Sequence, residues 1–436
     1  MSADRDVNRR PGRGSSPRRV WLAVLLGLAL AAVLLTALPD DDREGGAACG
    51  PRTVASWSAD TELTGAFARY GDDTARTDDW TGGDGTHSVR LPDGRVLWLF
   101  SDTYLGQVHA PPNPAGQPHT WRDASAPFVR NSGVVMSRSG SLERTLAAPL
   151  FTDPAPGQWR WPVAAKVEPR SPGSDEQVVR VLLWNRTTGT GPWIYGVPAA
   201  TEVATLSLPD LRLEGIVTVS DQRAVAAPEE RVLYGTSTVD ADGWTYVFGG
   251  NDGQATARPA SHAYVARVPH GRLSEPRAWQ FWDGKDWTAT GTTARGNAKG
   301  TAGKKPEPVL GDGQKRGVGS AFSVARVDGT YVLFTMGAGA EALSTVTSYW
   351  ACSPTGPWHG PAKGFAPPLP KDGAARQDTA AYNPQVHPAL SKDGRLVLSY
   401  DVNWLDATPS TAAANISRNV SLYRPRFVSL KLAQER

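Results

Sequence analysis

The sequence predicts an all-β fold, a five-bladed β-propeller, preceded by a single N-terminal transmembrane or signal-anchor helix. Glycine (45), proline (35) and tryptophan (16) are abundant while only 20% of the residues are charged, a composition typical of rigid, loop-rich β proteins. Short apolar runs joined by Asp-Gly recur along the chain, and one long uncharged apolar run lies near the N-terminus. A pair of β-sandwiches fits the same composition and stays open as the alternative.

The N-terminal helix is predicted from its length and its flanks. Residues 20–38 carry no charge, and nineteen apolar residues are long enough to span a bilayer. Residues 1–19 contain six arginines and two aspartates, and such an arginine-rich tail stays in the cytoplasm, so the rest of the chain faces outward. Residues 39–54 are a linker. The alternative is a cleaved signal peptide and a secreted protein.

The charge of the body limits its partners. The whole chain carries +3, and the tail alone carries +4, so the remaining residues sum to about −1. This body has no basic field of the kind that nucleic-acid binding needs, and we expect no nucleic-acid partner. No zinc or phosphate-binding motif is present, so we predict neither a metal nor a cofactor. Cys49 and Cys352 suit an oxidising compartment and could form one disulfide.

The body is predicted to span residues 55–433 and to consist of repeated hairpins. Asp-Gly between two apolar runs is a strong hairpin signal, because both turn positions need positive φ. The four predicted turns are Asp93 and Gly94, Asp242 and Gly243, Asp328 and Gly329, and Asp393 and Gly394. A fifth hairpin is expected within residues 162–186. Residues 292–317 are predicted to be a flexible insertion.

The first hairpin contains two carboxylates that are candidates for catalysis. If its turn is centred on Asp93 and Gly94, Asp84 lies opposite Thr103 and Asp102 lies close by at the same open end. Like charges at that distance raise one pKa, which leaves one carboxyl protonated and one ionised. Glycoside hydrolysis uses such a pair. The alternative is that both are structural acids of a turn and a cap.

Polar and aromatic residues are expected to gather beside this pair, on the rim of the central channel. A turn centred on Asp393 and Gly394 places Asn383 opposite Trp404 and His387 opposite Tyr400. Amides, carboxylates and aromatic faces of this kind suit sugar hydroxyls and sugar rings. The predicted substrate-binding residues are Trp80, Asn131, Trp161, Asn383, His387, Asp401, Asn403 and Trp404. His387 could equally be a hydrogen-bonded structural histidine, and Glu168 is a third acid by composition only.

Four motifs carry a resemblance to a known group of proteins. They are GGDGTHSVRLPDGRVLWLFSDTYLG, YVFGG with AYVARVP, TGPW, and YNPQVHPALSKDGRLVLSYDVN. With them the chain resembles uncharacterised bacterial secreted five-bladed propellers and, more distantly, the propeller glycoside hydrolases that include endo-D-arabinanases. The resemblance covers residues 55–433. It implies that Asp84 and Asp102 correspond to the acidic pair of the arabinan-cleaving relatives, and Asn383 and His387 to residues of the rim.

These observations predict an outward-facing glycoside hydrolase of the cell membrane that acts on an envelope or environmental polysaccharide, with arabinan as one candidate. Its partners are then a polysaccharide or oligosaccharide and, through the N-terminal helix, the membrane. A non-catalytic carbohydrate-binding or cell-surface propeller is the rival interpretation. A third is a scaffold without a ligand, in which residues 292–317 fill the rim.

Overall fold

The computed structural model describes residues 49–77, 79–193, 195–256, 260–289, 305–312, 315–336, 344–370, 379–404 and 409–434. The chain divides into two units, residues 1–48 and 49–436, and all described residues belong to the second. The predicted tail and the predicted membrane helix at residues 20–38 therefore lie outside the described residues. Within the described ranges, no helix has the length and apolar character needed to cross a membrane.

The second unit is built almost entirely from antiparallel strands in six sheets. The first sheet is β3 (His87–Arg90), β4 (Val96–Phe100), β7 (Ser132–Met136) and β8 (Leu142–Thr145). The second is β9 (Gln158–Pro169), β10 (Gln177–Thr187), β11 (Val197–Leu206) and β12 (Leu213–Asp221). The third is β13 (Leu233–Ala241), β14 (Trp244–Gly250), β15 (Ala263–Pro269), β16 (Gln280–Trp282) and β17 (Trp287–Thr288).

The fourth sheet is β18 (Phe322–Val327), β19 (Thr330–Met336) and β20 (Val346–Ala351). The fifth is β21 (Thr379–Val386), β22 (Arg395–Trp404), β23 (Arg426–Gln434) and β1 (Arg52–Ala59). A small sixth sheet, β2 (Trp80–Gly83), β5 (Thr103–Leu105) and β6 (Phe128–Val129), adjoins the first. Two α-helices, α2 (Thr61–Gly71) and α3 (Pro409–Arg418), complete the described elements together with short 3-10 turns.

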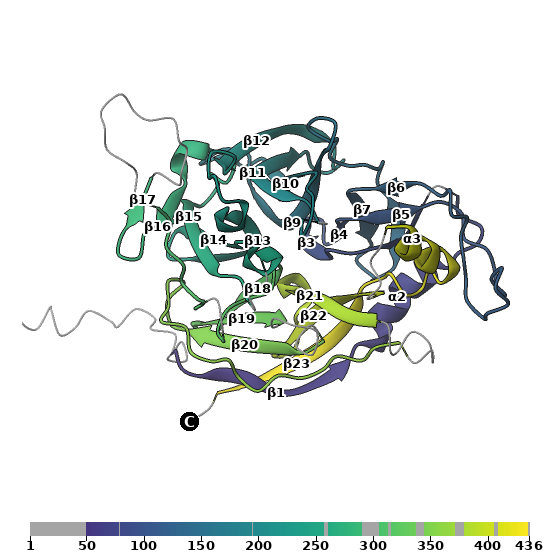
Figure 1. Cartoon of the computed structure of the whole chain (residues 1–436). Helices are drawn as coiled ribbons and strands as arrows, with labels where there is room; N and C mark the ends of the chain where they lie inside the picture. The colour runs from purple at the N-terminus through teal and green to yellow at the C-terminus, as the bar shows by residue number, and fades with distance from the viewer. Residues whose placement is uncertain are drawn as a thin grey trace, which may run out of the picture. The chain divides into compact units, whose positions relative to one another are not determined.

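The larger sheets are arranged as in a propeller. Their first strands contact one another in chain order, β3 with β9, β9 with β13, β13 with β18 and β18 with β21. Figure 1 shows these strands around a common centre, with the later strands of each sheet further out. Ser88 of β3 and His387, which follows β21, are joined by a hydrogen bond of 2.8 Å and so link the last sheet to the first. The all-β, propeller-like prediction is confirmed.

The two ends of the domain meet in the fifth sheet. β1 pairs antiparallel with β23, from Arg52 opposite Gln434 to Ala59 opposite Val428. β1 begins three residues before the predicted start of the domain at residue 55. Cys49 and Cys352 form a disulfide whose Cα atoms are 5.7 Å apart, which ties the start of β1 to the segment after β20.

Three of the predicted Asp-Gly turns have the expected backbone. Asp242, Asp328 and Asp393 have φ of 52°, 45° and 53°, and the glycine after each is also positive, as a type I′ turn requires. The first hairpin differs, because Leu91 to Arg95 form a longer connection in which the amide of Leu91 bonds to the carbonyl of Arg95. His87 consequently pairs with Leu99, one residue away from the predicted register.

The last hairpin departs further from its prediction. The turn at Asp393 is correct, but a 3-10 turn, η4 (Pro388–Leu390), takes up residues between the turn and β21. Tyr382 therefore pairs with Asp401, and Thr379 pairs with Trp404. The predicted pairings of Asn383 with Trp404 and of His387 with Tyr400 are wrong, because a two-residue turn cannot account for the extra residues of η4.

Two other predicted segments are partly described. Residues 162–186 form the expected hairpin of β9 and β10, with Pro169 opposite Gln177. The end of the predicted insertion at 292–317 packs against β15, because Leu310 forms a bridge with Ala263 and is 4% exposed. Residues 292–304, 313 and 314 of this insertion lie outside the described residues.

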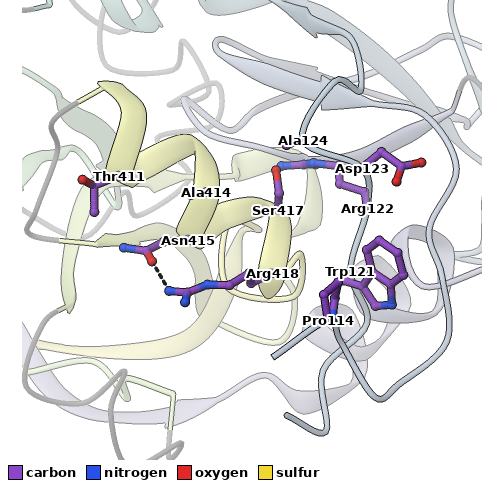
Figure 2. A pocket seen from close by; sticks show the side chains of 10 residues that line it. All are labelled: Pro114, Trp121, Arg122, Asp123, Ala124, Thr411, Ala414, Asn415, Ser417 and Arg418. Carbon is purple, nitrogen blue, oxygen red and sulfur yellow. Dashed lines mark hydrogen bonds between the residues drawn. The ribbon is translucent and has the colours of Figure 1, made fainter. Parts of the chain in front are cut away.

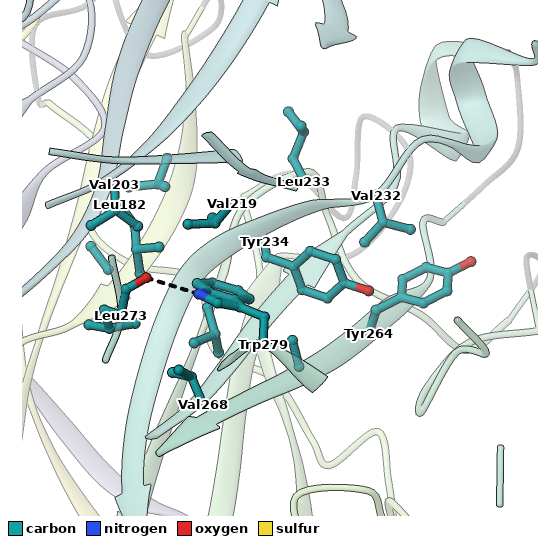
Figure 3. Packing of buried hydrophobic residues seen from close by; sticks show 14 of the residues in the cluster. Leu182, Val203, Val219, Val232, Leu233, Tyr234, Tyr264, Val268, Leu273 and Trp279 are labelled. Atoms are coloured by element: carbon teal, nitrogen blue, oxygen red, sulfur yellow. Dashed lines mark hydrogen bonds between the residues drawn. The ribbon is translucent and has the colours of Figure 1, made fainter. Parts of the chain in front are cut away.

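The space between neighbouring sheets is filled by aromatic and branched side chains. In Figure 3, Leu182 and Val203 of the second sheet face Tyr234 and Val268 of the third, with Trp279 between them. The indole of Trp279 donates 2.9 Å to the carbonyl of Leu273, so its one polar atom is satisfied in the core. This packing fixes the strand ends that hold the polar residues described next.

Candidate active site

Asp84 and Asp102 lie directly opposite each other where the first sheet meets the small sixth sheet. Gly83 pairs with Thr103, which sets Asp84 against Asp102 instead of against Thr103 as predicted. The amide of Asp84 donates 3.1 Å to the carbonyl of Asp102, and the amide of Ser101 donates 2.7 Å to the carbonyl of Asp84.

Asp102 is held by two donors from later segments of the same chain. Arg130 Nη1 lies 3.1 Å from Oδ1 and 3.0 Å from Oδ2, and Trp161 Nε1 donates to Oδ1 at 2.7 Å. Burial raises the pKa of Asp102, while the charge of Arg130 and the indole hydrogen bond lower it. The Asp102 side chain keeps 21% of its surface, so a ligand can reach this carboxylate.

Asp84 has neutral partners and a higher pKa. The hydroxyl of Tyr382 donates 2.9 Å to its Oδ2, and the hydroxyl of Tyr423 also bonds to it. Burial, followed by the charges of Asp102 and Asp401, holds the pKa of Asp84 well above its usual range. With its partners neutral and two carboxylates near, Asp84 is the member of the pair whose pKa is raised further.

Asp401 is a third carboxyl beside the pair, and the three acids are called the carboxylate cluster from here on. The amide of Gly85 donates 2.7 Å to its Oδ2, the hydroxyl of Thr86 donates 2.9 Å to its Oδ1, and Asn383 Nδ2 lies 3.2 Å from Oδ2. Asp401 is 1% exposed, and burial raises its pKa to about 7 against the effect of these donors. It fixes the backbone next to Asp84.

Further acids and arginines form ion pairs on the second sheet and at the residue Asp252, which follows β14. Arg160 Nε lies 2.6 Å from Glu202 Oε2, and Asn185 Nδ2 donates to the same carboxylate at 3.2 Å. Arg186 forms a buried ion pair with Asp252. Sequence reasoning missed Glu202 and all of these arginines as site residues, although charged residues inside the apolar runs of β10 and β11 are a usable signal.

Several predicted site residues belong to the core. Trp80 is fully buried against Phe100, with ring centroids 5.0 Å apart. His387 is 1% exposed and lies between Ser88 and Ser399, 2.8 Å from each hydroxyl. Burial lowers the pKa of His387 to about 3, so this ring is neutral and structural. Placing Trp80 and His387 on the rim is therefore corrected.

Asn131 is corrected for the same reason, while Trp404 is half-buried and its predicted role stays a prediction. Asn131 is fully buried, and its amide bonds to the backbone of Phe151 and of Arg160. Trp404 packs against the hydrophobic cluster between the fourth and fifth sheets. Asn403 occupies the same face of β22 as Asp401, since alternate residues of a strand point the same way. Of the predicted rim residues, the structure brings Trp161, Asn383 and Asp401 to the pair.

Glu168, the acid considered from composition, lies at the other end of β9. It is seven residues from Trp161, a distance of about 23 Å along a strand. Its buried carboxylate pairs with Arg180 at 3.2 Å. It therefore serves the core of the second sheet.

A separate groove of about 600 Å³ lies between α3 and the segment before β6. Figure 2 shows its lining, with the ring of Trp121 on one side and Arg418 bonded to Asn415 on the other. Arg122 joins this groove to the site region, because its guanidinium lies 3.9 Å from the ring centre of Tyr104. The carboxylate cluster is not part of the lining, and within the described ranges no three acidic, histidine or cysteine side chains are arranged to hold a metal ion.

Residues 68–432 match the model of a family described as a domain of unknown function, DUF5005. The chain belongs to this family. The DUF5005 match begins in α2 and ends in β23, so it includes the whole carboxylate cluster. A comparison with curated proteins gave no match.

Solved structures resemble the DUF5005 domain over most of its length. A Bacteroides ovatus ATCC 8483 protein provisionally named a hydrolase aligns with a TM-score of 0.63 and 18% identity, covering 86% of this chain and 90% of that one. The catalytic domain of a GH62 α-L-arabinofuranosidase from Coprinopsis cinerea aligns at 0.47 and 12% identity, covering 82% and 92%. The α-L-arabinofuranosidase of Podospora anserina, solved with cellotriose, aligns at 0.46 and 12%, covering 81% and 97%. At these identities the first likeness shows a shared fold.

Proposed function

We propose that this DUF5005 domain is a glycoside hydrolase in which Asp84 and Asp102 carry the reaction. The observation that supports this most directly is their direct opposition with unequal surroundings: Asp102 has an arginine and an indole, and Asp84 has two tyrosines. Unequal pKa values in a carboxyl pair are the arrangement that acid–base cleavage of a glycosidic bond needs. The Bacteroides ovatus protein of similar fold, named a hydrolase, is consistent with a hydrolytic reaction.

The two roles follow from the surroundings of each carboxyl. Asp84 starts protonated and gives its proton to the glycosidic oxygen as the bond to the anomeric carbon breaks. Asp102 starts ionised and either removes a proton from the attacking water or bonds to the anomeric carbon before water releases the sugar. Asp401 is a positioning residue, because it holds the amide of Gly85 and adds negative charge beside Asp84.

The wider proposal places the domain outside the cell as a five-bladed propeller. Five sheets whose first strands contact one another in order support the blade number. The Cys49–Cys352 disulfide supports an oxidising compartment, consistent with residues 20–38 as an anchor or an export signal. The substrate is an envelope or environmental polysaccharide, and arabinan is the first one to test.

The experiment is release of reducing ends from arabinan-rich polysaccharide by the full chain and by Asp84→Asn and Asp102→Asn. Loss of a general acid or base lowers kcat about 10²- to 10⁴-fold, so both variants should fall at least that far. Asp242→Asn is the matched control, because this exposed turn residue has positive φ and asparagine adopts the same turn. Activity that survives in either cluster variant would overturn the assignment.

The second candidate function is carbohydrate binding without cleavage. The observation that favours it is the two-contact ion pair of Asp102 with Arg130, an arrangement that also occurs in fixed binding sites. Glycan binding that is equal in the wild type and in Asp84→Asn, with no release from a broad panel of polysaccharides, would establish this function and exclude hydrolysis.

A further inference from the structure

Three arginines of the site region are each paired with an acid. The three pairs are Arg130 with Asp102, Arg160 with Glu202, and Arg186 with Asp252. Asp84 and Asp401 have no cation partner among the described residues. None of these three arginines is therefore left to neutralise a negatively charged sugar. Such a site favours an uncharged ligand.

One aromatic side chain near this site is markedly exposed. Tyr195 lies between β10 and β11 and is 63% exposed, the highest value among the large hydrophobic side chains of the described residues. The protein around it and then the charge of Asp84 raise the pKa of its phenol, so the ring lies within electrostatic reach of that carboxyl. A tyrosine offers an apolar ring and a polar hydroxyl, which suits it to a ligand with both kinds of surface.

The backbone next to Tyr195 is fixed on residues of the site. Gly196 has φ of +82°, and a Cβ there would lie 2.4 Å from ring carbons of Trp159, so only glycine allows this close approach. The carbonyl of Gly196 accepts 3.1 Å from Arg186 Nη2. The Trp159 ring in turn lies 4.6 Å from the guanidinium of Arg130 and 5.7 Å from the ring of Trp161.

These contacts connect Tyr195 to Asp102 from the side of the second sheet. Arg130 and Trp161 are the two donors of Asp102, and both contact the ring on which Gly196 rests. Asp84 and its tyrosines approach from the first and fifth sheets. The backbone beside Tyr195 is thus fixed by residues that contact the two donors of Asp102, while the Tyr195 side chain is left open to a ligand.

We infer that Tyr195 is a substrate-positioning residue whose ring stacks on an uncharged sugar bound at the Asp84–Asp102 pair. This inference rests on the proposed function and adds the ligand class and the residue that orients it. Uronic and sulfated sugars are the excluded class, because these three arginines are already paired with acids.

The test measures KM, kcat and direct binding with neutral arabino-oligosaccharides and with oligogalacturonates. Tyr195→Ala should raise KM three- to tenfold and weaken binding equally, the range for one lost aromatic contact, with a smaller change in kcat. Tyr195→Phe should behave as the wild type. Binding is followed by tryptophan fluorescence in the Asp84→Asn background, which prevents turnover. Trp57→Ala is the control, an aromatic that is 37% exposed and stacked on Phe365.

The outcomes separate the inference from the proposed function. If the wild type cleaves arabinan and Tyr195→Ala has the same KM and affinity as the wild type, the inference is overturned and the proposed function stands. A phenylalanine variant as weak as the alanine variant overturns stacking, because the hydroxyl would then be the contact. Oligogalacturonates that bind as well as neutral sugars overturn the charge argument. A wild type that binds and cleaves no glycan overturns both.

Discussion

Asp401 shows how one buried carboxyl can link folding to pH. Its pKa of about 7 lies above the usual value, because burial outweighs the donors from Gly85, Thr86 and Asn383. A carboxyl with a raised folded-state pKa contributes stability that is full below its unfolded pKa of about 4, and this stability is lost as pH rises through the folded value near 7. The relevant window is therefore about pH 4 to 7.

We expect the stability cost of Asp401→Asn to be largest near pH 4 and to shrink toward pH 7.5. Asparagine does not titrate, so the variant does not lose stability through this residue as pH rises from 4 to 7, whereas the wild type does. The measurement is the free energy of unfolding in denaturant at four pH values, with Asp242→Asn as the reference. Burial lowers the pKa values of His87 and His387 to about 3, so these two residues make the folded protein more stable as pH rises, opposite to Asp401. Both variants retain these histidines, so the difference between the two unfolding free energies removes their effect. A cost that grows with pH would mean that the donors keep Asp401 ionised.

At the residue scale, the proximity of Asp84 and Asp102 could be predicted because it is local to one hairpin. Asp84 and Asp102 were found because an antiparallel turn brings them together. Arg130 and Glu202 were missed because they reach the site from other strands, and their positions depend on how sheets pack. Trp80 and His387 were misplaced because polar or aromatic character alone does not tell which side of a strand faces the core.

At the scale of single elements, the turns decide the register. The Asp-Gly signal located every predicted turn, but counting residues outward from a turn failed wherever the connection was longer than two residues. The connection from Leu91 to Arg95 shifts the strand pairing of the first hairpin by one residue relative to the prediction. The 3-10 turn η4 shifts the pairing of the last hairpin by more than one residue. A one-residue shift changes which side chains are opposed, and here it brought Asp84 directly opposite Asp102.

A turn glycine should be more sensitive to substitution than an edge-strand glycine. Gly243 has φ of +79°, and the position that a Cβ would occupy there is open, so Gly243→Ala tests backbone strain alone and should cost about 1 to 2 kcal/mol. Gly215 of the edge strand β12 has ordinary φ and equally open surroundings, so Gly215→Ala should be close to neutral. Denaturant unfolding of both variants gives the comparison. Equal costs would show that the positive φ at Gly243 relaxes without penalty.

At the scale of the whole domain, its two ends hold the last sheet together. β1 supplies the outer strand of a sheet whose other strands come from the C-terminal end. The disulfide fastens β1 across 303 residues of sequence. The composition and the hairpin spacing pointed to this class of fold, but neither showed that the N-terminal strand would join the last sheet, since no local pattern encodes a partner so distant in sequence.

Removal of the disulfide should therefore destabilise the domain without changing its fold. Cys49→Ser with Cys352→Ser is expected to cost about 2 to 4 kcal/mol, the usual range for a native disulfide. Thermal unfolding of the double variant, beside the wild type with and without reductant, measures this cost. Reductant should lower the Tm of the wild type and leave that of the variant unchanged. An unaltered Tm in the variant would show that the β1–β23 pairing alone secures the N-terminal strand.

The pairing of β1 with β23 also sets an order of events while the chain is being made. β1 leaves the ribosome before any other strand of the domain, yet its partner is the last strand to be translated. At about 5 to 20 residues per second, the 303 residues between the two cysteines alone take roughly 15 to 60 s. During that interval β1 has no β23 to pair with, so it must be kept from pairing elsewhere until β23 has been translated.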